Sequence, residues 1–335
     1  MMKILISHPH LKLSDFDIVL QLNDDVIRID RNLEKETKDD VSLDAFIERV
    51  VNKLVDEKRF RTAETYQCMR RSLARYTGGH LPVLRNVDGL FVKSYEHYLK
   101  NNHVSMNTIS FYMRIFRAVY NRAVKHKLVI DSHPFSEVYT GVCKTQKRAV
   151  EIGVLKRLKA FNYKSPAEQF ACDMFLFSFY TRGMSFVDMA YLKKKDLENG
   201  YLTYVRRKTG FKMVVKWERS MEEIVRRYPT GSSQYLLPII CRNDRDEWKQ
   251  YHSKQNCINT QLKRISQELG LQQVLTMYVA RHSWASIANQ MNIPMETIRQ
   301  AMGHSSEKTT RIYIKTIENS YVDKVNRKLI NIINL

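Results

Sequence analysis

The sequence predicts a mainly α-helical protein with one small β-hairpin, arranged as two helical modules joined by a short linker. Three observations lead to this fold class. Apolar residues recur at helical spacing through residues 41–139, the pattern changes to that of β-strands near residues 200–217, and helical spacing returns after residue 220. A chain of 335 residues is also long enough to bury two or three separate cores.

The first module is a set of helices predicted between residues 41 and 139. Its apolar side chains recur every three or four residues, which places them on one face of each helix. The second of these stripes stops at Gly78 and Gly79, as is typical of a helix C-terminus. The four stripes are Leu43, Phe46, Val50 and Leu54; Tyr66, Met69, Leu73 and Tyr76; Val92, Tyr95 and Leu99; and Ile109, Tyr112, Phe116, Val119 and Tyr120.

The segment before this module is the least informative part of the chain. Residues 18–28 can contain a short strand, and residues 31–40 form a charged linker. We therefore leave residues 1–40 as a short N-terminal segment without an assigned role.

The second module is predicted over residues 151–313, after a linker at residues 140–150. Residues 170–179 are so rich in phenylalanine that they predict a buried core helix. Residues 200–205 and 212–217 are rich in β-branched and aromatic residues, and Thr209 with Gly210 between them predicts a hairpin turn. Residues 314–335 predict a tail helix, whose apolar stripe packs either on a neighbouring protomer or on its own domain.

The charge balance points to a polyanionic partner. Lys and Arg total 55 against 35 Asp and Glu, a formal net charge of +20, which favours nucleic acid before an acidic membrane surface. No apolar run reaches the roughly 18 residues that a membrane-spanning helix needs. The five cysteines are scattered without metal-ligand spacing. We expect no metal, no cofactor and no membrane association, and a cytoplasmic location on DNA.

Three short motifs near the C-terminal end combine an arginine, a histidine and a tyrosine. Residues 281–285 read RHSWA, residues 301–306 read AMGHSS and residues 310–313 read TRIY, so His304 and Tyr313 lie nine positions apart. Arg281 offers a two-pronged donor to phosphate oxygens, and His304 can donate a hydrogen bond or accept a proton. Tyr313 is a nucleophile that can hold a phosphoryl group covalently. Together they predict cleavage of a phosphodiester bond.

This ordered set resembles the C-terminal signature of the tyrosine recombinases, also called phage-type integrases. In that family an Arg-His pair opens a helix, a Gly-His turn follows, and Thr-x-x-Tyr ends the site. The resemblance implies that residues 41–139 are a helical core-binding domain that clamps DNA, and that residues 151–313 are the catalytic domain. It implies that Tyr313 forms a 3′-phosphotyrosyl bond with double-stranded DNA, in a homo-tetramer on synapsed sites, without metal or ATP. We therefore predict a recombinase of a bacterial mobile element that integrates, excises or inverts DNA.

The resemblance also suggests a general acid. Integrases carry a lysine at a β-turn, placed to protonate the leaving 5′ oxygen, and Lys208 lies at the predicted hairpin turn. Arg206, Arg207 and Lys212 are nearby, and the Thr209-Gly210 pair that follows favours Lys208.

Two positions depart from the family pattern. Residues 183–188 read GMSFVD, and alignment with the family's Gly-Leu-Arg run places Ser185 where the first arginine belongs. We expect Arg182, three residues earlier, to replace it from nearly the same helix face. Residues 278–281 read YVAR, so Tyr278 stands where His-x-x-Arg has its histidine, and Tyr313 then depends more on His304. Such variants resemble the integrases and invertases of Bacteroides-type mobile elements.

Two other functions remain open at the level of sequence. A non-catalytic DNA-binding regulator explains the charge and the helices, but it does not explain the order of Lys208, Arg281, His304 and Tyr313. A type IB topoisomerase uses almost the same residues and relaxes supercoils as a monomer.

Overall fold

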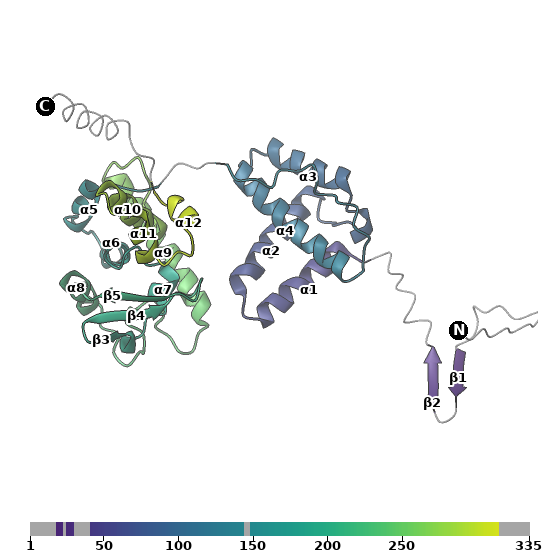
Figure 1. Ribbon diagram of the computed structural model, residues 1–335, viewed down its shortest axis with the longest axis horizontal. Helices are drawn as coiled ribbons and strands as arrows, with labels where there is room; N and C mark the ends of the chain where they lie inside the picture. The colour runs from purple at the N-terminus through teal and green to yellow at the C-terminus, as the bar shows by residue number, and fades with distance from the viewer. Residues whose placement is uncertain (1–17, 23–24, 30–40, 144–147, 315–335) are drawn as a thin grey trace, which may run out of the picture. The chain divides into compact units, whose positions relative to one another are not determined.

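The computed structural model describes residues 18–22, 25–29, 41–143 and 148–314, and the chain divides into two compact units between Lys144 and Thr145 (Figure 1). This point lies inside the segment predicted as a linker. In the described residues, no helix combines the length and the apolar character that a membrane span requires. The predicted tail helix lies outside the described residues from residue 315 onward.

The N-terminal unit contains a helical core built from the predicted stripes. Its helices are α1 (Leu43–Asp56), α2 (Phe60–Tyr76), α3 (Gly89–Asn101) and α4 (Met106–Lys125), with a short 3-10 helix, η1 (Leu84–Asn86), between α2 and α3. Side chains of Ser42, Asp88 and Ser105 cap the N-termini of α1, α3 and α4 by accepting backbone N–H bonds. Leu43, Met69 and Phe116 are fully buried in the shared core. The stripes therefore mark the packed faces, as periodicity predicts.

A two-stranded antiparallel ribbon precedes this helical core. Strand β1 (Ile18–Leu22) pairs with β2 (Asp25–Ile29). The sequence predicted a single short strand in this region, and the structure shows two.

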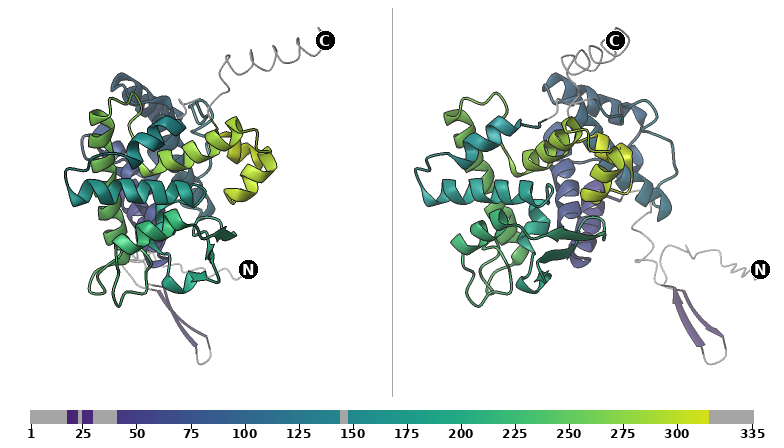
Figure 2. Two further views of the ribbon diagram at one scale, coloured as in Figure 1. Left: turned by 90° about the vertical axis from the view of Figure 1, so that its left-hand side faces the viewer. Right: turned by 60° about the vertical axis from the view of Figure 1, so that its left-hand side comes forward.

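The C-terminal unit surrounds one apolar helix, α6 (Pro166–Tyr180). Helix α6 packs against α9 (Glu247–Glu268), α10 (Met277–Gln290), α8 (Arg219–Arg227) and α5 (Ile152–Lys159) (Figure 2). Phe175 and Phe177 are fully buried, because neighbours cover α6 on most sides. Three short helices complete the unit, α7 (Phe186–Ala190), α11 (Met295–Ala301) and α12 (Glu307–Arg311), with a 3-10 helix, η2 (Lys194–Asp196), after α7.

A three-stranded antiparallel sheet contains the predicted hairpin. Strands β4 (Tyr201–Val205) and β5 (Lys212–Lys216) pair with Val205 opposite Lys212, and β3 (Leu197–Glu198) adds a short edge strand that the sequence did not predict. Alternate residues of β4, Leu202 and Tyr204, face the core. Arg206 continues this alternation into the loop and is also buried. The fold class is therefore the predicted one, mainly helical with one small sheet among the described residues of this unit.

Candidate active site

Four segments of the C-terminal unit converge on Tyr313. They are helix α10, the turn after α11, the end of α12, and the loop between β4 and β5. The guanidinium carbon of Arg281 lies 5.3 Å from the centroid of the Tyr313 ring, and the His304 ring stacks on that ring at 5.1 Å and 26°. Three of the residues that sequence motifs singled out thus lie in one cluster.

Arg281 is a buried cation held mainly by carbonyl groups. Its side chain projects from α10, and the residue is 4% exposed. Nη1 donates to the carbonyl of Gly183 at 2.6 Å, and Nη2 donates to the carbonyl of Met302 at 2.7 Å and to Nε2 of His304 at 2.8 Å. Burial, and then the charge of Arg206, lower the pKa of Arg281. Its Nε has no hydrogen-bond partner among the described residues.

Two glycines allow the backbone to approach the two arginines closely. A Cβ on Gly183 would lie 2.8 Å from the Arg281 Cα, and one on Gly303 would lie 2.9 Å from Cδ of Arg206. Both glycines have positive φ, 71° and 62°, a conformation that residues with a side chain rarely adopt. The carbonyls of these two glycines also accept hydrogen bonds from the guanidiniums.

Arg206 supplies a second buried guanidinium, 5% exposed, next to the first. Its Nη1 donates to the carbonyl of Gly303 at 2.6 Å and to that of Met302 at 3.1 Å. The Met302 carbonyl therefore accepts from both arginines. In the part of the chain that the structure describes, the Nε of Arg206 also has no hydrogen bond, and the carboxylate Oδ2 of Asp188 is 3.8 Å from it.

Asp188 links Ser185 to the hairpin that carries Arg206. The Ser185 hydroxyl donates to Oδ2 of Asp188 at 2.6 Å, while the backbone N–H of Arg207 donates to Oδ1 at 2.9 Å. Ser185 also caps α7 by accepting the backbone N–H of Asp188. Ser185, which the sequence pattern aligns with the family's first arginine, is thus part of the structure that orients the hairpin loop.

His304 lies just after α11, in a turn that Gly303 makes possible. The residue is 4% exposed. Its Nε2 contacts Arg281, and its Nδ1 is 3.0 Å from the hydroxyl of Thr310. Burial, followed by the charges of Arg281, Arg206, Lys208 and Arg299, lowers the pKa of His304 to about 3. The imidazole is therefore neutral near pH 7.

Tyr313 follows α12 and is held through its backbone as well as its ring. Its carbonyl accepts hydrogen bonds from Nδ1 of His282 at 3.1 Å and from the Ser286 hydroxyl at 3.2 Å. The His282 ring also lies 4.7 Å from the Tyr313 ring. Tyr278, about half exposed, lies 5.7 Å from the Tyr313 ring, and burial together with a hydrogen bond to Tyr313 raises the pKa of Tyr278.

Lys208 lies at the exposed tip of the hairpin, two residues beyond Arg206. The loop is closed by the backbone N–H of Arg206 donating to the Phe211 carbonyl at 2.9 Å, and Gly210 adopts a φ of 68°. The charge of Lys208 reaches His304, since it is one of those that lower the histidine pKa. Lys208 is thus an exposed cation on the loop that carries Arg206.

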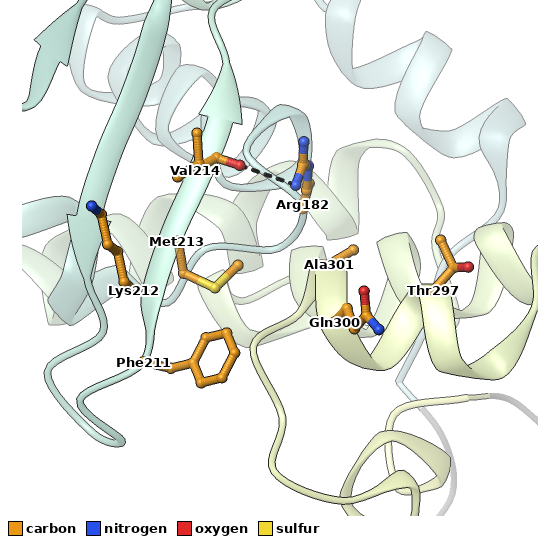
Figure 3. Close-up of a pocket in the computed structure, with 8 residues that line it drawn as sticks. All are labelled: Arg182, Phe211, Lys212, Met213, Val214, Thr297, Gln300 and Ala301. Carbon is orange, nitrogen blue, oxygen red and sulfur yellow. Dashed lines mark hydrogen bonds between the residues drawn. The ribbon is translucent and has the colours of Figure 1, made fainter.

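The side chain of Arg182 bonds to the sheet and not to the residues of this cluster. Its guanidinium donates to the carbonyl of Val214 at 3.2 Å and borders a pocket of about 240 Å³ between β5 and α11 (Figure 3). Within the described residues it has no hydrogen bond to Arg281, His304 or Tyr313. The other residues of this pocket are Phe211, Lys212, Met213, Val214, Thr297, Gln300 and Ala301.

The prediction that Arg182 and Ser185 share a helix face is wrong. Helix α6 ends at Tyr180, and Arg182 and Gly183 both adopt positive φ before Ser185 caps the new helix α7. Two consecutive left-handed residues turn the chain, so the helical geometry that would bring Arg182 to the Ser185 position does not exist.

Sequence reasoning missed three residues of this cluster: Arg206, His282 and Thr310. All three lie within or next to the motifs, but their contacts depend on the tertiary structure. Arg206 had one usable signal, because it is in phase with the buried side chains of Leu202 and Tyr204. In the described part of the chain, no group of three or more His, Cys, Asp or Glu side chains could hold a metal ion.

Comparison with known families matches both units. The phage integrase SAM-like domain family matches residues 42–140, and the phage integrase family matches residues 153–319. A two-unit helical protein with an Arg, His and Tyr cluster in its C-terminal unit is thus of the DNA integrase class. The chain belongs to the phage integrase family, the tyrosine recombinases.

Curated relatives share part of the sequence. The chain is 29% identical over 157 residues to tyrosine recombinase XerA of Thermococcus kodakarensis, covering 45% of this chain and 53% of the relative. It is 25% identical over 122 residues to tyrosine recombinase XerA of Saccharolobus solfataricus, covering 36% and 37%. The aligned segments thus span about half of these relatives or less.

Solved structures share the fold over most of the chain. A lambda integrase fragment, residues 75–356, bound as a dimer to a COC′ core site, is 14% identical with a TM-score of 0.61, covering 82% of this chain and 95% of that one. The Tn1549 transposon integrase in complex with a circular intermediate DNA is 13% identical with a TM-score of 0.61, covering 86% and 99%. At these identities the likeness concerns the fold alone.

Proposed function

We propose that this protein is a site-specific DNA recombinase that cuts and rejoins strands through a covalent bond between Tyr313 and the 3′ phosphate of DNA. The observation that supports it most is the pair of buried guanidiniums, Arg281 and Arg206, next to His304 and Tyr313. Within the described residues no carboxylate hydrogen-bonds to either guanidinium, neither Nε has a hydrogen bond, and the Asp188 carboxylate approaches Arg206 only to 3.8 Å. Buried charges are usually paired, so this arrangement favours an anionic ligand such as a phosphodiester.

The proposed chemistry follows from these groups. The two arginines bind the non-bridging oxygens of the phosphate and stabilise the negative charge that develops on these oxygens in the transition state. The Tyr313 oxygen attacks phosphorus, the bond to the 5′ oxygen breaks, and Lys208 protonates the leaving oxygen. The phosphodiester energy remains in the phosphotyrosyl bond, so a 5′ hydroxyl can reverse the step. Neither metal nor ATP is then needed.

Double-stranded DNA is the proposed partner, and a tetramer on synapsed sites is the proposed assembly. Lambda integrase has been solved as a tetramer bound to a Holliday junction, which supports this assignment by family. The helical unit offers exposed basic side chains along α2 and α4 that make no ion pair with a carboxylate in the described residues. They are Arg71, Arg75, Arg114, Arg117 and Lys125. Such cations suit contacts along a phosphate backbone.

A nicked DNA substrate tests the proposed function. Cleavage near the nick releases a short 5′-hydroxyl fragment, so the covalent intermediate cannot be reversed and accumulates. With duplexes made from the DNA that flanks the coding region, we expect an adduct that resists SDS and disappears after protease treatment. A regulator that only binds DNA would give a band shift without any adduct. Relaxation of supercoiled plasmid without synapsis would instead favour the topoisomerase.

The two candidates for the first-arginine role make opposite predictions. We assign this role to Arg206 rather than Arg182, since Arg206 is buried beside Arg281. Arg206→Ala should reduce single-turnover cleavage by roughly a hundredfold or more, as expected when a buried donor to developing charge is removed. Arg182→Ala is the matched control and should cleave within about threefold of wild type, because it loses one bond to a carbonyl.

A rescue experiment checks the same assignment. Arg206→Lys keeps a cation at this position without the two-pronged donor, and it should recover part of the activity that Arg206→Ala loses. Severe loss in Arg182→Ala with mild loss in Arg206→Ala would reverse the assignment in favour of Arg182.

A further inference from the structure

The two ring nitrogens of His304 have different partners, and this fixes the position of its proton. Nε2 is 2.8 Å from Nη2 of Arg281, and Nδ1 is 3.0 Å from the hydroxyl oxygen of Thr310. A guanidinium only donates hydrogen bonds, so Nε2 must accept with its lone pair. The proton of the neutral ring is then on Nδ1, and the Thr310 hydroxyl accepts it.

The charges around His304 favour the same neutral form. Arg281, Arg206, Lys208 and Arg299 all act to lower its pKa, after burial itself. The Tyr313 ring stacks on His304, and the Tyr278 ring lies 5.7 Å from that of Tyr313. An extra proton on Nε2 would point toward the Arg281 donor, which makes the imidazolium unfavourable until an anion enters.

Thr310 is suitably placed to connect His304 with the nucleophile. It is fully buried on the short helix α12, and its carbonyl accepts the backbone N–H of Tyr313 at 2.9 Å. The Thr310 hydroxyl thus contacts His304, and the Thr310 carbonyl holds the backbone of Tyr313.

We propose that Thr310 is a positioning residue that holds the Nδ1 proton of His304 and thereby keeps Nε2 free of a proton, as the base for the Tyr313 phenol. This rests on the proposed function. When a phosphate draws the Arg281 donor away, the Tyr313 O–H proton moves to Nε2 and the phenol oxygen bonds to phosphorus. The bond to the 5′ oxygen breaks, and Lys208 protonates this leaving oxygen. The imidazolium keeps Nδ1–H on Thr310, and the added negative charge of the phosphate offsets the surrounding cations.

Which ring nitrogen of His304 carries the proton can be measured by NMR in the absence of DNA. In the full-length protein labelled with ¹⁵N-histidine, His304→Gln identifies the His304 signals among those of the ten histidines. We expect the Nδ1–H tautomer in wild type and in Thr310→Ser, which keeps the hydroxyl. Thr310→Val has nearly the same shape without an acceptor and should show a mixed or reversed tautomer. An Nε2–H tautomer in wild type would overturn the proposal, whatever the variants do.

Cleavage kinetics provide the second readout. Thr310→Val should slow single-turnover cleavage of the nicked substrate by roughly tenfold or more, as expected for a weakened general base, with DNA affinity unchanged. Thr310→Ser should stay within about threefold, since the same group accepts the proton. A folded Thr310→Val that keeps the wild-type tautomer or the wild-type rate would refute the role of Thr310.

Should that variant fail to fold, the tautomers of wild type and Thr310→Ser still test whether the His304 proton is on Nδ1. If wild type forms no adduct at all, the proposed function fails, while the tautomer is tested independently.

Discussion

Replacing Tyr313 with phenylalanine should abolish covalent attachment to DNA and leave DNA binding within a few-fold of wild type. Only the phenol oxygen is lost, and the ring can keep its stacking on His304 at 5.1 Å. Affinity for DNA comes mainly from many phosphate contacts, none of which depends on this oxygen. The measurement combines adduct formation on a nicked duplex with a binding titration.

Tyr201→Phe is the matched control for this variant. Tyr201 is 48% exposed at the start of β4, and its hydroxyl lies outside the cluster. We expect Tyr201→Phe to cleave like wild type. Adduct formation by Tyr313→Phe at the wild-type level would show that another residue is the nucleophile.

Arg281→Ala should reduce strand cleavage by more than a hundredfold. A buried donor that contacts the developing phosphorane charge contributes roughly 3 kcal/mol or more to transition-state stabilisation. The residue also holds Nε2 of His304 and two carbonyls, so its loss disturbs several contacts at once. Arg281→Lys keeps a charge without the two-pronged donor and should recover only part of the rate.

Thermal melting of Arg281→Ala, together with a surface variant as control, shows whether a loss of cleavage comes from lost catalysis or from unfolding. Arg219→Ala removes a side chain that is 93% exposed, and it should leave both melting and cleavage unchanged. A loss below about tenfold in a folded Arg281→Ala would mean that another group supplies the main phosphate contact.

Local patterns predicted those parts of the fold and site that local physics determines. The apolar stripes of α1 to α4, the hairpin between β4 and β5, and the turn at Gly303 each depend on a few neighbouring residues. The motifs at Arg281, His304 and Tyr313 are close in sequence and also close in the structure. These are the cases in which spacing along the chain carries most of the information.

Arg206 and Arg182 show where sequence reasoning reached its limit. Arg206 contacts Gly303, which is 97 positions away, so no local window contains the pair. The prediction for Arg182 requires a helix that begins at residue 182, yet Ser185 and Asp188 form the start of α7. A serine followed three residues later by an acidic residue is a helix-start signal, and it favours a start at Ser185. The position of Arg206 beside Arg281 could therefore be found only from the folded structure.

The central claim is that Tyr313 itself becomes linked to DNA, and mass spectrometry of the trapped adduct tests it most directly. After proteolysis and nuclease digestion, the account predicts a single peptide containing Tyr313 with a nucleotide attached through its phenol oxygen to a 3′ phosphate. An attached nucleotide on any other residue, or a link through a 5′ phosphate, would contradict it.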